Sequence, residues 1–402
     1  MTAVRHFTIV GGGQAGLLLA IGLRLGGHQV RLVQDRGAEE TARGRLPSPQ
    51  CLFHGAVAYE RSLGLDLWSE AAPAIELCEI AELARPGAAT PQLSFGGSFR
   101  SPGQAIDPRL KFSAWLERLV ELGGELEIAT ATTADIERYA RESDLVVIAA
   151  GRDGFDGLFP RDDRNSPFAT PQRALSLIYL KGAVGDARRP GIRSTGIAGQ
   201  GTVIDIPVLT AHGAADSLTF EAFSGSALDV GSGRLDAAAL AGRMLTALRE
   251  MLPDRWERFR DAQPVDDGAY LSGAVVPTVR NAVGVLPSGR AVLGIGDTVV
   301  TNDPITAQGA NNATRLAALY VSAIDRRGDG AFDGEWMANL AAAAWARIRA
   351  ATYFTNLTLL GAPTLVAALH RASESQAIAD RFVEGFNEPG TILPFLMAAS
   401  PR

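Results

Sequence analysis

The sequence predicts an α/β fold in which a parallel sheet is interrupted by an inserted antiparallel sheet. Three observations predict it. A strand, a glycine-rich turn, a helix and a second strand follow one another within the first 35 residues, the order of a βαβ unit. Two continuous apolar runs, at 144–150 and 291–296, have the character of buried parallel strands. Between these runs, residues 175–230 alternate in short apolar and polar pieces, as antiparallel strands do.

The individual elements follow from local patterns. Strands are expected at 6–10 and 29–33, on either side of the first glycine-rich turn and its helix. Residues 39–55 are rich in Gly, Pro, Ser and Arg and are predicted to form a loop. Apolar periodicity and end signals predict further helices at 107–122, at 235–251, from 306 onward and over most of 333–385.

The pieces of the parallel sheet are far apart in the sequence, so the second domain is inserted rather than appended. We therefore expect a dinucleotide-binding domain in three parts, a β-sheet substrate domain in two parts, and a C-terminal helical region. In chain order, the expected boundaries are 1–75, 76–104, 105–165, 166–275, 276–330 and 331–402.

Composition excludes several classes of protein. The chain has 402 residues, of which 47% are hydrophobic, enough for a sizeable core, and its net charge of −6 excludes a generally basic nucleic-acid binder. Two cysteines and five scattered histidines predict neither a disulfide framework nor a metal site. No apolar run reaches the roughly 20 residues that span a bilayer, and the N-terminal segment lacks a cleavage pattern. We expect a cytoplasmic protein without a membrane anchor.

The first glycine-rich turn has the spacing GxGxxG and predicts a dinucleotide site. Gly11 permits the tight turn, Gly13 lets the backbone approach a pyrophosphate, and Gly16 lets the helix pack closely on the strand. Gln14 and Ala15 stand between Gly13 and Gly16 and begin the helix. The N-terminus of this helix offers free N–H groups and the positive end of the helix dipole to a phosphate. Context supports the motif, because it follows a predicted strand and precedes a predicted helix.

The acidic residue that usually contacts the ribose should follow about 20 residues after this motif. That position holds Gln34, and Asp35 comes next. The ribose contact is therefore either displaced by one residue or made differently.

A second glycine-rich segment indicates FAD rather than NAD. Asp297 follows a buried strand and could accept hydrogen bonds from ribityl hydroxyls. Backbone N–H groups after Pro304 could face the N1/O2 edge of an isoalloxazine, which is negatively charged when reduced. The candidate contacts in this second turn are Gly309, Ala310, Asn311 and Asn312.

The two glycine-rich segments together resemble the flavoprotein monooxygenase superfamily with the aromatic-hydroxylase, glutathione-reductase-type fold. Within that superfamily, three stretches resemble the oxygenase subunits of styrene and indole monooxygenases. They are Asn165–Phe168 with Pro171–Leu175, Gly296–Asn311, and Thr355-Asn356-x-Thr358. The resemblance covers essentially the whole chain and implies an FAD-binding Rossmann-like domain, an inserted β-sheet substrate domain and C-terminal helices.

The resemblance also implies a reaction. A separate NADH-dependent flavin reductase would supply reduced FAD, since the chain has no second nucleotide-binding glycine motif. O2 would add at the flavin C4a, and the hydroperoxide would epoxidise indole at C2–C3, leading to indoxyl and indigo. No catalytic side chain is implied, because the flavin carries the chemistry and the protein supplies orientation and dryness. A homodimer is compatible with the resemblance.

Substrate positions implied by the resemblance favour the indole type. Ser48, Gln50 and Ile75 match that type, whereas Leu52, Cys78 and Gly103 are conservative departures from it. None of the six positions carries the styrene-type residue. Gln50 offers both a donor and an acceptor, which suits an indole N–H.

Two arginines are candidate FAD contacts, Arg45 by its family position and Arg109 by weaker similarity. Styrene epoxidation or sulfoxidation by the same family is one alternative activity. A single-component NAD(P)H-dependent aromatic hydroxylase is another, since Gly151–Phe155 resembles the DG motif of such enzymes in degenerate form. Flavin halogenases share the fold, but their WxWxIP motif is missing from this sequence.

Overall fold

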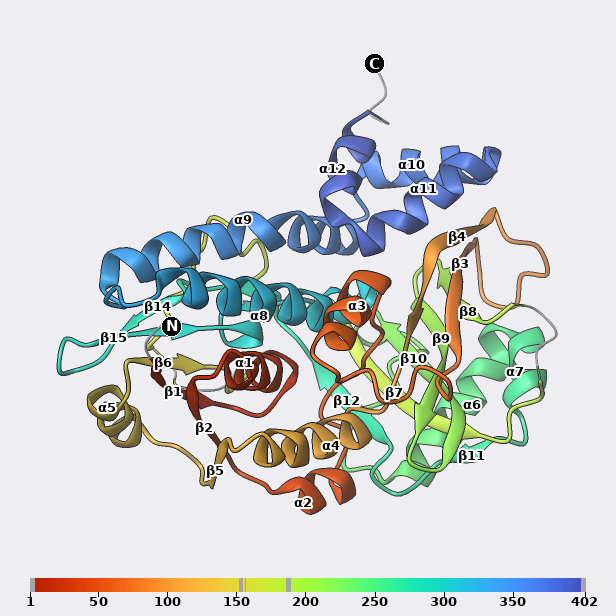
Figure 1. The fold of residues 1–402 in the computed structure, drawn as a ribbon. Helices are drawn as coiled ribbons and strands as arrows, with labels where there is room; N and C mark the ends of the chain where they lie inside the picture. Colours follow the sequence, from red (N-terminus) through yellow and green to blue (C-terminus); the bar gives the residue numbers. More distant parts are fainter. Residues whose placement is uncertain (1–3, 152–154, 156, 186–188, 399–402) are drawn as a thin grey trace.

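The computed structural model describes residues 4–151, 155, 157–185 and 189–398, and two sheets organise it (Figure 1). The first, sheet A, has the strand order β14-β15-β6-β1-β2-β5. In chain order its strands are β1 (His6–Val10), β2 (Gln29–Gln34), β5 (Glu125–Ile128), β6 (Leu145–Ile148), β14 (Val283–Val285) and β15 (Ala291–Gly294).

Sheet A confirms the predicted parallel core. Strand β1 pairs in parallel with β2 and β6, and β15 pairs in parallel with β6, so the three distant apolar runs lie side by side. Phe7 and Ile9 at the centre are fully buried. The edge strands β5 and β14 were not predicted. Strand β5 has only four residues, none of them buried, and β14 has three, so neither carries a clear apolar pattern.

Helices cover sheet A and bring two glycine-rich turns together. Helix α1 (Gln14–Leu25) packs against α8 (Gln308–Arg327), where a Cβ on Gly22 would lie 2.7 Å from the Val321 side chain. The Tyr320 hydroxyl at 3.0 Å from the Gly294 carbonyl holds α8 to β15. Helix α9 (Gly334–Leu359) runs along α8 above the sheet, as Figure 1 shows. The other helices of this half are α4 (Pro108–Glu121) and α5 (Thr133–Glu142).

Sheet B has the order β11-β7-β10-β9-β8-β3-β4, with β12 also paired to β7. Its pairs are antiparallel as predicted, except that β3 and β8 run parallel where the two parts of the inserted sheet join. Two hydrophobic clusters form on it, one against α6 (Ala237–Met251) and α7 (Pro253–Phe259). The strands are β3 (Ala74–Leu83), β4 (Leu93–Gln104), β7 (Ala174–Lys181), β8 (Gly191–Ile197), β9 (Gly201–Thr210), β10 (Gly213–Ala222), β11 (Gln263–Pro264) and β12 (Tyr270–Ala274).

The predicted loop at 39–55 was wrong at both ends. Helix α2 (Ala38–Arg43) forms there, and α3 (His54–Ser62) begins inside the predicted range. The segment of α2 consists largely of good helix formers, and the Gly37 N–H donates to the Glu40 carboxylate at 3.1 Å, which caps the first turn. The Pro- and Ser-containing stretch between the two helices is a loop, as predicted.

Helices α10 (Pro363–Glu374), α11 (Gln376–Asn387) and α12 (Pro389–Met397) form the C-terminal group at the top of Figure 1. Helix α11 lies against β4, where a Cβ on Gly97 would be only 2.5 Å from the Ala379 carbonyl oxygen. No single helix among the described residues meets the length and hydropathy needed to cross a bilayer, although α9 and α10, bent by 90° where they join, meet them as a pair.

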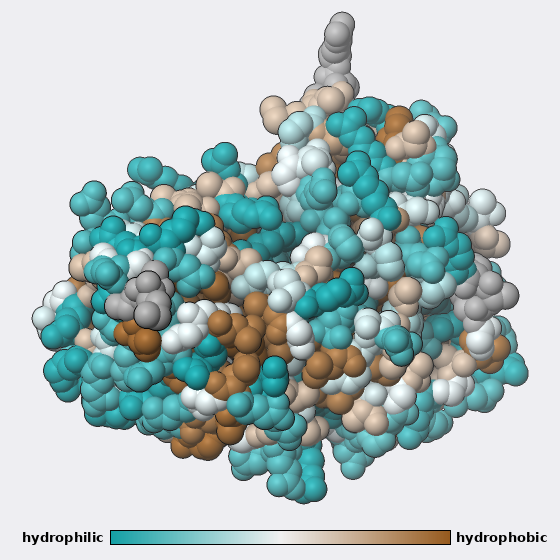
Figure 2. Space-filling view, viewed as in Figure 1, coloured by the Kyte–Doolittle hydropathy of each residue, from teal (hydrophilic) through white to brown (hydrophobic). Residues whose placement is uncertain are grey.

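The division into domains and its boundaries stay predictions; strand β3 of sheet B begins at Ala74, two residues before the predicted boundary at 76. Hydrophobic residues gather near the middle of the face shown in Figure 2, where α1 and α4 lie, and hydrophilic residues cover much of the rest. The short elements between sheet B and α8 are β13 (Thr278–Val279), η1 (Gly296–Thr298), β16 (Val300–Thr301) and η2 (Pro304–Thr306).

Candidate functional site

The first glycine-rich turn leaves the N-terminus of α1 open. Gly11 has φ 113°, and a Cβ there would lie 2.2 Å from the Ala149 carbonyl oxygen. A Cβ on Gly16 would lie 1.9 Å from the Gly11 carbonyl oxygen, so the helix can pack here only without a side chain. A Cβ on Gly13 would meet nothing within 4 Å, and no side chain caps the helix. The N-terminus of α1 therefore has no side-chain cap and has open space beside Gly13, which fits a phosphate group.

An amide occupies the place beside this turn where an acidic residue is usual. The Gln34 side chain lies against Gly12, and its Nε2 donates to the Arg36 carbonyl. Asp35 is exposed and pairs with the Arg36 guanidinium at 3.2 Å. A ribose contact from Gln34 or Asp35 stays a prediction.

The second glycine-rich turn opens α8 in the same way. Ala307 adopts a left-handed conformation after Pro304 in η2, and no side chain caps the helix that follows. A Cβ on Gly309 would meet nothing within 4 Å, and Ala310 is half-buried beside it. The Thr355 hydroxyl in α9 contacts the Thr306 hydroxyl, so the C-terminal motif positions this turn.

Three polar residues near this turn differ in their hydrogen bonds and exposure. Asn311 accepts from the Phe53 N–H at 3.0 Å and donates to the Cys51 carbonyl at 2.9 Å, so it ties α8 to the loop before α3. The buried Asn312 Nδ2 has no hydrogen-bond partner, although its Oδ1 accepts from Arg315. Asp297 is exposed in η1, where Gly296 closely approaches Ala15 of α1.

Four of the six predicted substrate positions lie at the paired strands β3 and β4: Leu52, Ile75, Cys78 and Gly103. Ile75 in β3 lies opposite Gly103 in β4, and a Cβ on Gly103 would be 2.3 Å from the Leu52 carbonyl oxygen. Leu52 in turn forms a bridge with Gln104. Cys78 belongs to the same hydrophobic cluster as Ile75, whose exposed fraction is 0%. Ser48 is half-buried in the adjoining loop.

Gln50 connects this apolar layer to α1. Its side chain is 7% exposed, and its Nε2 lies 3.3 Å from the Gln14 Oε1. Its Oε1 is buried and has no hydrogen-bond partner. A buried acceptor without a donor is costly, so this atom is a candidate contact for a bound molecule.

The two candidate arginines have other partners. The exposed Arg45 places its guanidinium 4.5 Å from the centre of the Tyr270 ring. Arg109 is buried and donates to the carboxylates of Asp107 and Asp266 and to the Gly44 carbonyl. These acceptors use every N–H of its guanidinium, which holds the pKa of Arg109 above its usual value against the effect of burial. An FAD contact from Arg109 stays a prediction, which requires the guanidinium to exchange one of these acceptors for the cofactor.

Two buried charged clusters were not found from the sequence. Lys111 Nζ lies 2.5 Å from the Glu60 Oε1, with side-chain exposures of 1% and 0%. Burial raises the pKa of Glu60 and lowers the pKa of Lys111, while their mutual attraction acts in the opposite direction. The partners stand far apart in the sequence, and nothing local signals their pairing.

The second cluster lies beside the turn before α8. Glu221 in β10 is fully buried next to Asp303. Burial, with the nearby negative charge of Asp303, raises the pKa of Glu221 well above its usual value. Burial also raises the pKa of Asp303 and lowers the pKa of Arg173, whose guanidinium lies 4.2 Å from the centre of the Phe223 ring.

These features fit FAD. Two uncapped helix N-termini, each with a glycine whose Cβ position is free, lie side by side at α1 and α8. The first suits a pyrophosphate and the second the negatively charged edge of a reduced flavin. Three residues of the degenerate DG motif lie outside the described residues, namely Arg152, Asp153 and Gly154. The single-component alternative that this motif suggested stays a prediction.

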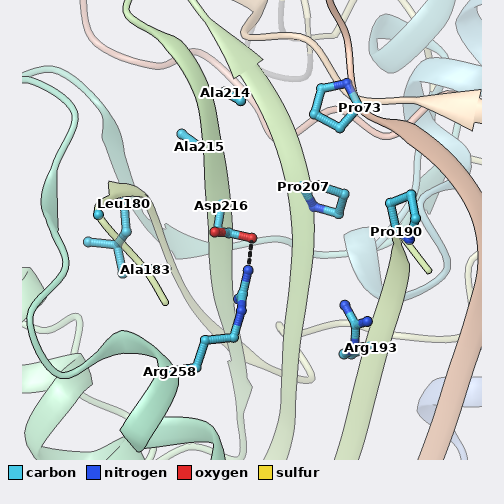
Figure 3. A pocket seen from close by; sticks show the side chains of 11 residues that line it. Pro73, Leu180, Ala183, Pro190, Arg193, Pro207, Ala214, Ala215, Asp216 and Arg258 are labelled. Carbon is cyan, nitrogen blue, oxygen red and sulfur yellow. Dashed lines mark hydrogen bonds and ion pairs between the residues drawn. The ribbon is translucent and has the colours of Figure 1, made fainter. Parts of the chain in front are cut away.

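A separate hollow of about 310 Å³ lies on sheet B. Figure 3 shows Pro73, Pro190 and Pro207 around it, with the Arg258 guanidinium paired to Asp216 at 2.5 Å. None of the predicted substrate positions lines this hollow, so it is distinct from the site described above.

Comparison with known proteins adds three findings. Residues 151–258 match the family model "Styrene monooxygenase A putative substrate binding domain". The styrene monooxygenase StyA of Pseudomonas fluorescens is 31% identical over 397 residues, which cover 96% of this chain and 93% of that protein.

Solved structures share the fold at low identity. The flavin-dependent brominase Bmp2 aligns with a TM-score of 0.68 and 16% identity, covering 98% of this chain and 99% of its own. A flavoprotein/dehydrogenase from Cytophaga hutchinsonii aligns with a TM-score of 0.68 and 14% identity, covering 98% and 96%. Both likenesses concern the fold, and they agree with the predicted α/β architecture.

Proposed function

This chain belongs to the styrene monooxygenase family and is an FAD-dependent monooxygenase, and from that premise we propose that it epoxidises indole at C2–C3. The oxygenase is proposed to work as one half of a two-component system, with reduced FAD from a separate NADH-dependent flavin reductase. Such a supply of NADH supports a cytoplasmic location.

The observation that carries the indole assignment is the layer around Ile75. Ile75 and Cys78 belong to one hydrophobic cluster, Gly103 lies opposite Ile75, and Leu52 forms a bridge with the neighbouring Gln104. None of the six predicted positions has the styrene-type residue. Gln50 supplies the polar group there, with a buried acceptor that lacks a donor. An indole ring would bury its flat face among the apolar side chains and direct its N–H toward that acceptor.

The roles proposed for this chain's residues are binding, orientation and exclusion of water. When bound, reduced FAD supplies the two electrons that activate O2, so that one oxygen atom enters the substrate and the other leaves as water. The N-terminus of α8 stabilises negative charge on the flavin edge, and the region around Leu52 and Ile75 excludes water from the reacting atoms. No side chain is proposed to exchange a proton with the substrate.

The test separates the oxygenase from the reductase. Chemically reduced FAD, O2 and the purified chain should convert indole to indoxyl and then indigo, followed by absorbance and product analysis. NADH with oxidised FAD and the chain alone should give neither product formation nor NADH oxidation. NADH oxidation by the chain alone would instead support a single-component hydroxylase.

Styrene epoxidation is the second candidate, because the curated relative with 31% identity is a styrene monooxygenase. Initial rates on indole and styrene, with the same reduced FAD supply, decide between them. A higher kcat/KM for styrene would overturn the indole proposal without affecting the family assignment.

A further inference from the structure

A chain of buried polar side chains reaches from Lys111 to Gln50. Lys111 Nζ donates to the Glu60 Oε1 at 2.5 Å, and Gln14 Nε2 donates to the same oxygen at 2.6 Å. Gln50 Nε2 then lies 3.3 Å from the Gln14 Oε1. All four residues are buried, with exposed fractions of 0–7%. Lys111 is further held over the Trp115 ring, 4.7 Å from its centre.

The partners of Gln14 determine which way its amide points. Glu60 Oε1 also receives the Lys111 ammonium, so it can only accept from Gln14. Thr314 Oγ1 lies 3.0 Å from the Gln14 Nε2 and gives its own proton to the Ala310 carbonyl, so it must accept as well. Two acceptors on one side require the Gln14 amide nitrogen there. The Gln14 oxygen consequently faces Gln50.

The orientation of the Gln14 amide in turn fixes the orientation of the Gln50 amide. Since Gln14 presents an oxygen, Gln50 must turn its NH2 group toward Gln14. The Gln50 Oε1 then points away from the chain of contacts, and it is the buried atom without a hydrogen-bond partner. A free glutamine could present either end of its amide to a ligand, but this one is restricted to its acceptor.

We propose that Glu60, Lys111 and Gln14 are positioning residues that fix Gln50 as a hydrogen-bond acceptor and thereby select substrates that carry an N–H donor. The inference rests on the proposed function and deepens it. Such an N–H donor gains a hydrogen bond at Gln50, whereas a carbocycle of the same shape leaves the acceptor unpaired. Sites that hydrogen-bond a substrate group discriminate strongly against analogues that lack it.

The experiment compares indole with indene, a bicycle of the same shape that has no N–H. The measured quantity is the ratio of kcat/KM for indole to that for indene, with chemically reduced FAD. Wild type is expected to favour indole by about tenfold, the value of one hydrogen bond of about 1.4 kcal/mol. Gln50→Leu should abolish this preference.

The critical variant is Glu60→Met with Lys111→Met, which replaces the buried ion pair by apolar side chains of similar volume, a change that folds tolerate. It removes one of the two acceptors that hold the Gln14 amide nitrogen in place and so weakens the restriction on Gln50. The indole preference should therefore fall about threefold or more while indene turnover persists. When Gln50→Leu is already present, adding Glu60→Met and Lys111→Met should leave the ratio unaltered, because the Glu60–Lys111 pair affects the substrate only through Gln50.

Several results would overturn the proposal. An unchanged ratio in the folded Glu60→Met, Lys111→Met variant would show that the ion pair does not orient Gln50. Equal losses for indole and indene, with weaker binding of reduced FAD, would make a flavin N–H the donor instead. If the Glu60→Met, Lys111→Met variant does not fold, Thr314→Val removes the other acceptor of the Gln14 amide nitrogen, and it should also lower the ratio. Wild type without any preference for indole would contradict the proposed substrate, an outcome distinct from the others.

Discussion

At the scale of single residues, glycines that share a motif differ in what their missing side chain allows. Gly11 and Gly16 have no room for a Cβ, since protein atoms lie within 2.2 Å of that position. At Gly13 and Gly309 the same position is free. The first pair is therefore required by the fold itself, and the second pair leaves space for a bound group.

Gly309→Ala should affect folding and FAD binding in opposite directions. Alanine favours the first turn of α8 by up to about 1 kcal/mol, so the Tm without FAD should rise slightly. The added methyl group intrudes on the space proposed for the flavin edge, so affinity for reduced FAD should fall about tenfold. A thermal melt and an anaerobic fluorescence titration measure the two effects.

Gly242→Ala in α6 is the matched control, since its Cβ would also meet nothing within 4 Å. It should raise the Tm similarly and leave FAD affinity unchanged. Unaltered FAD binding in Gly309→Ala would remove the α8 N-terminus from the proposed cofactor contacts.

At the scale of elements, two adjacent glycines in β4 differ in what they face. A Cβ on Gly97 would lie 2.5 Å from the Ala379 carbonyl oxygen in α11, whereas on Gly96 it would make an ordinary 3.6 Å contact with Glu79. Gly97→Ala should therefore push α11 away from the strand and destabilise the protein by about 1–3 kcal/mol. Gly96→Ala should change stability by less than about 0.5 kcal/mol. Urea unfolding of both variants measures the difference, and equal stabilities would contradict this close packing.

Elements with strong local signals could be predicted from the sequence, and weak ones could not. Strand β1 and helix α4 were placed within a residue or two because apolar periodicity and end signals coincide there. Strand β5 has no buried residue, and α2 falls in a segment whose Gly and Pro content outweighed its helix formers. The parallel joint between β3 and β8 was not predicted, because it depends on which strands meet in space.

At the scale of the whole molecule, buried carboxyl groups make stability depend on pH. The pKa of Glu221 is raised by burial and by Asp303, so the folded protein binds a proton there more tightly than the unfolded chain. The associated stability is present below the usual pKa of 4.5 and is lost as the pH rises toward the raised value. Each unit of pKa difference corresponds to about 1.4 kcal/mol.

Glu221→Gln should remove part of this pH dependence. The Tm of the variant should equal or slightly differ from that of wild type near pH 4.5 and exceed it increasingly up to pH 8. Asp303 and Arg173, the charged groups beside it, stay in place. The exposed Glu117→Gln serves as the control and should follow wild type at every pH. Parallel melting curves for Glu221→Gln and wild type would show that Glu221 does not titrate as inferred.

The candidate site could be predicted from the sequence only where it depends on local patterns. The GxGxxG turn and the turn before α8 are local patterns, and the structure places both as expected. The Glu60–Lys111 pair joins α3 to α4, and Glu221 of β10 lies beside Asp303, directly before η2. Such pairs arise only when separate segments pack together, so one sequence without its fold does not reveal them. The saturated contacts of Arg109 were hidden for the same reason.

The two cysteines have a practical consequence. Cys51 and Cys78 are both buried, and burial raises the pKa of Cys51 to about 12 and that of Cys78 still further. Thiolates are the species that alkylating reagents and peroxide attack, so an intact molecule keeps both sulfurs inert even while it handles oxygen. Labelling of these two sulfurs would then occur only when the surrounding hydrophobic cluster opens transiently, and the labelling rate would measure how often it opens.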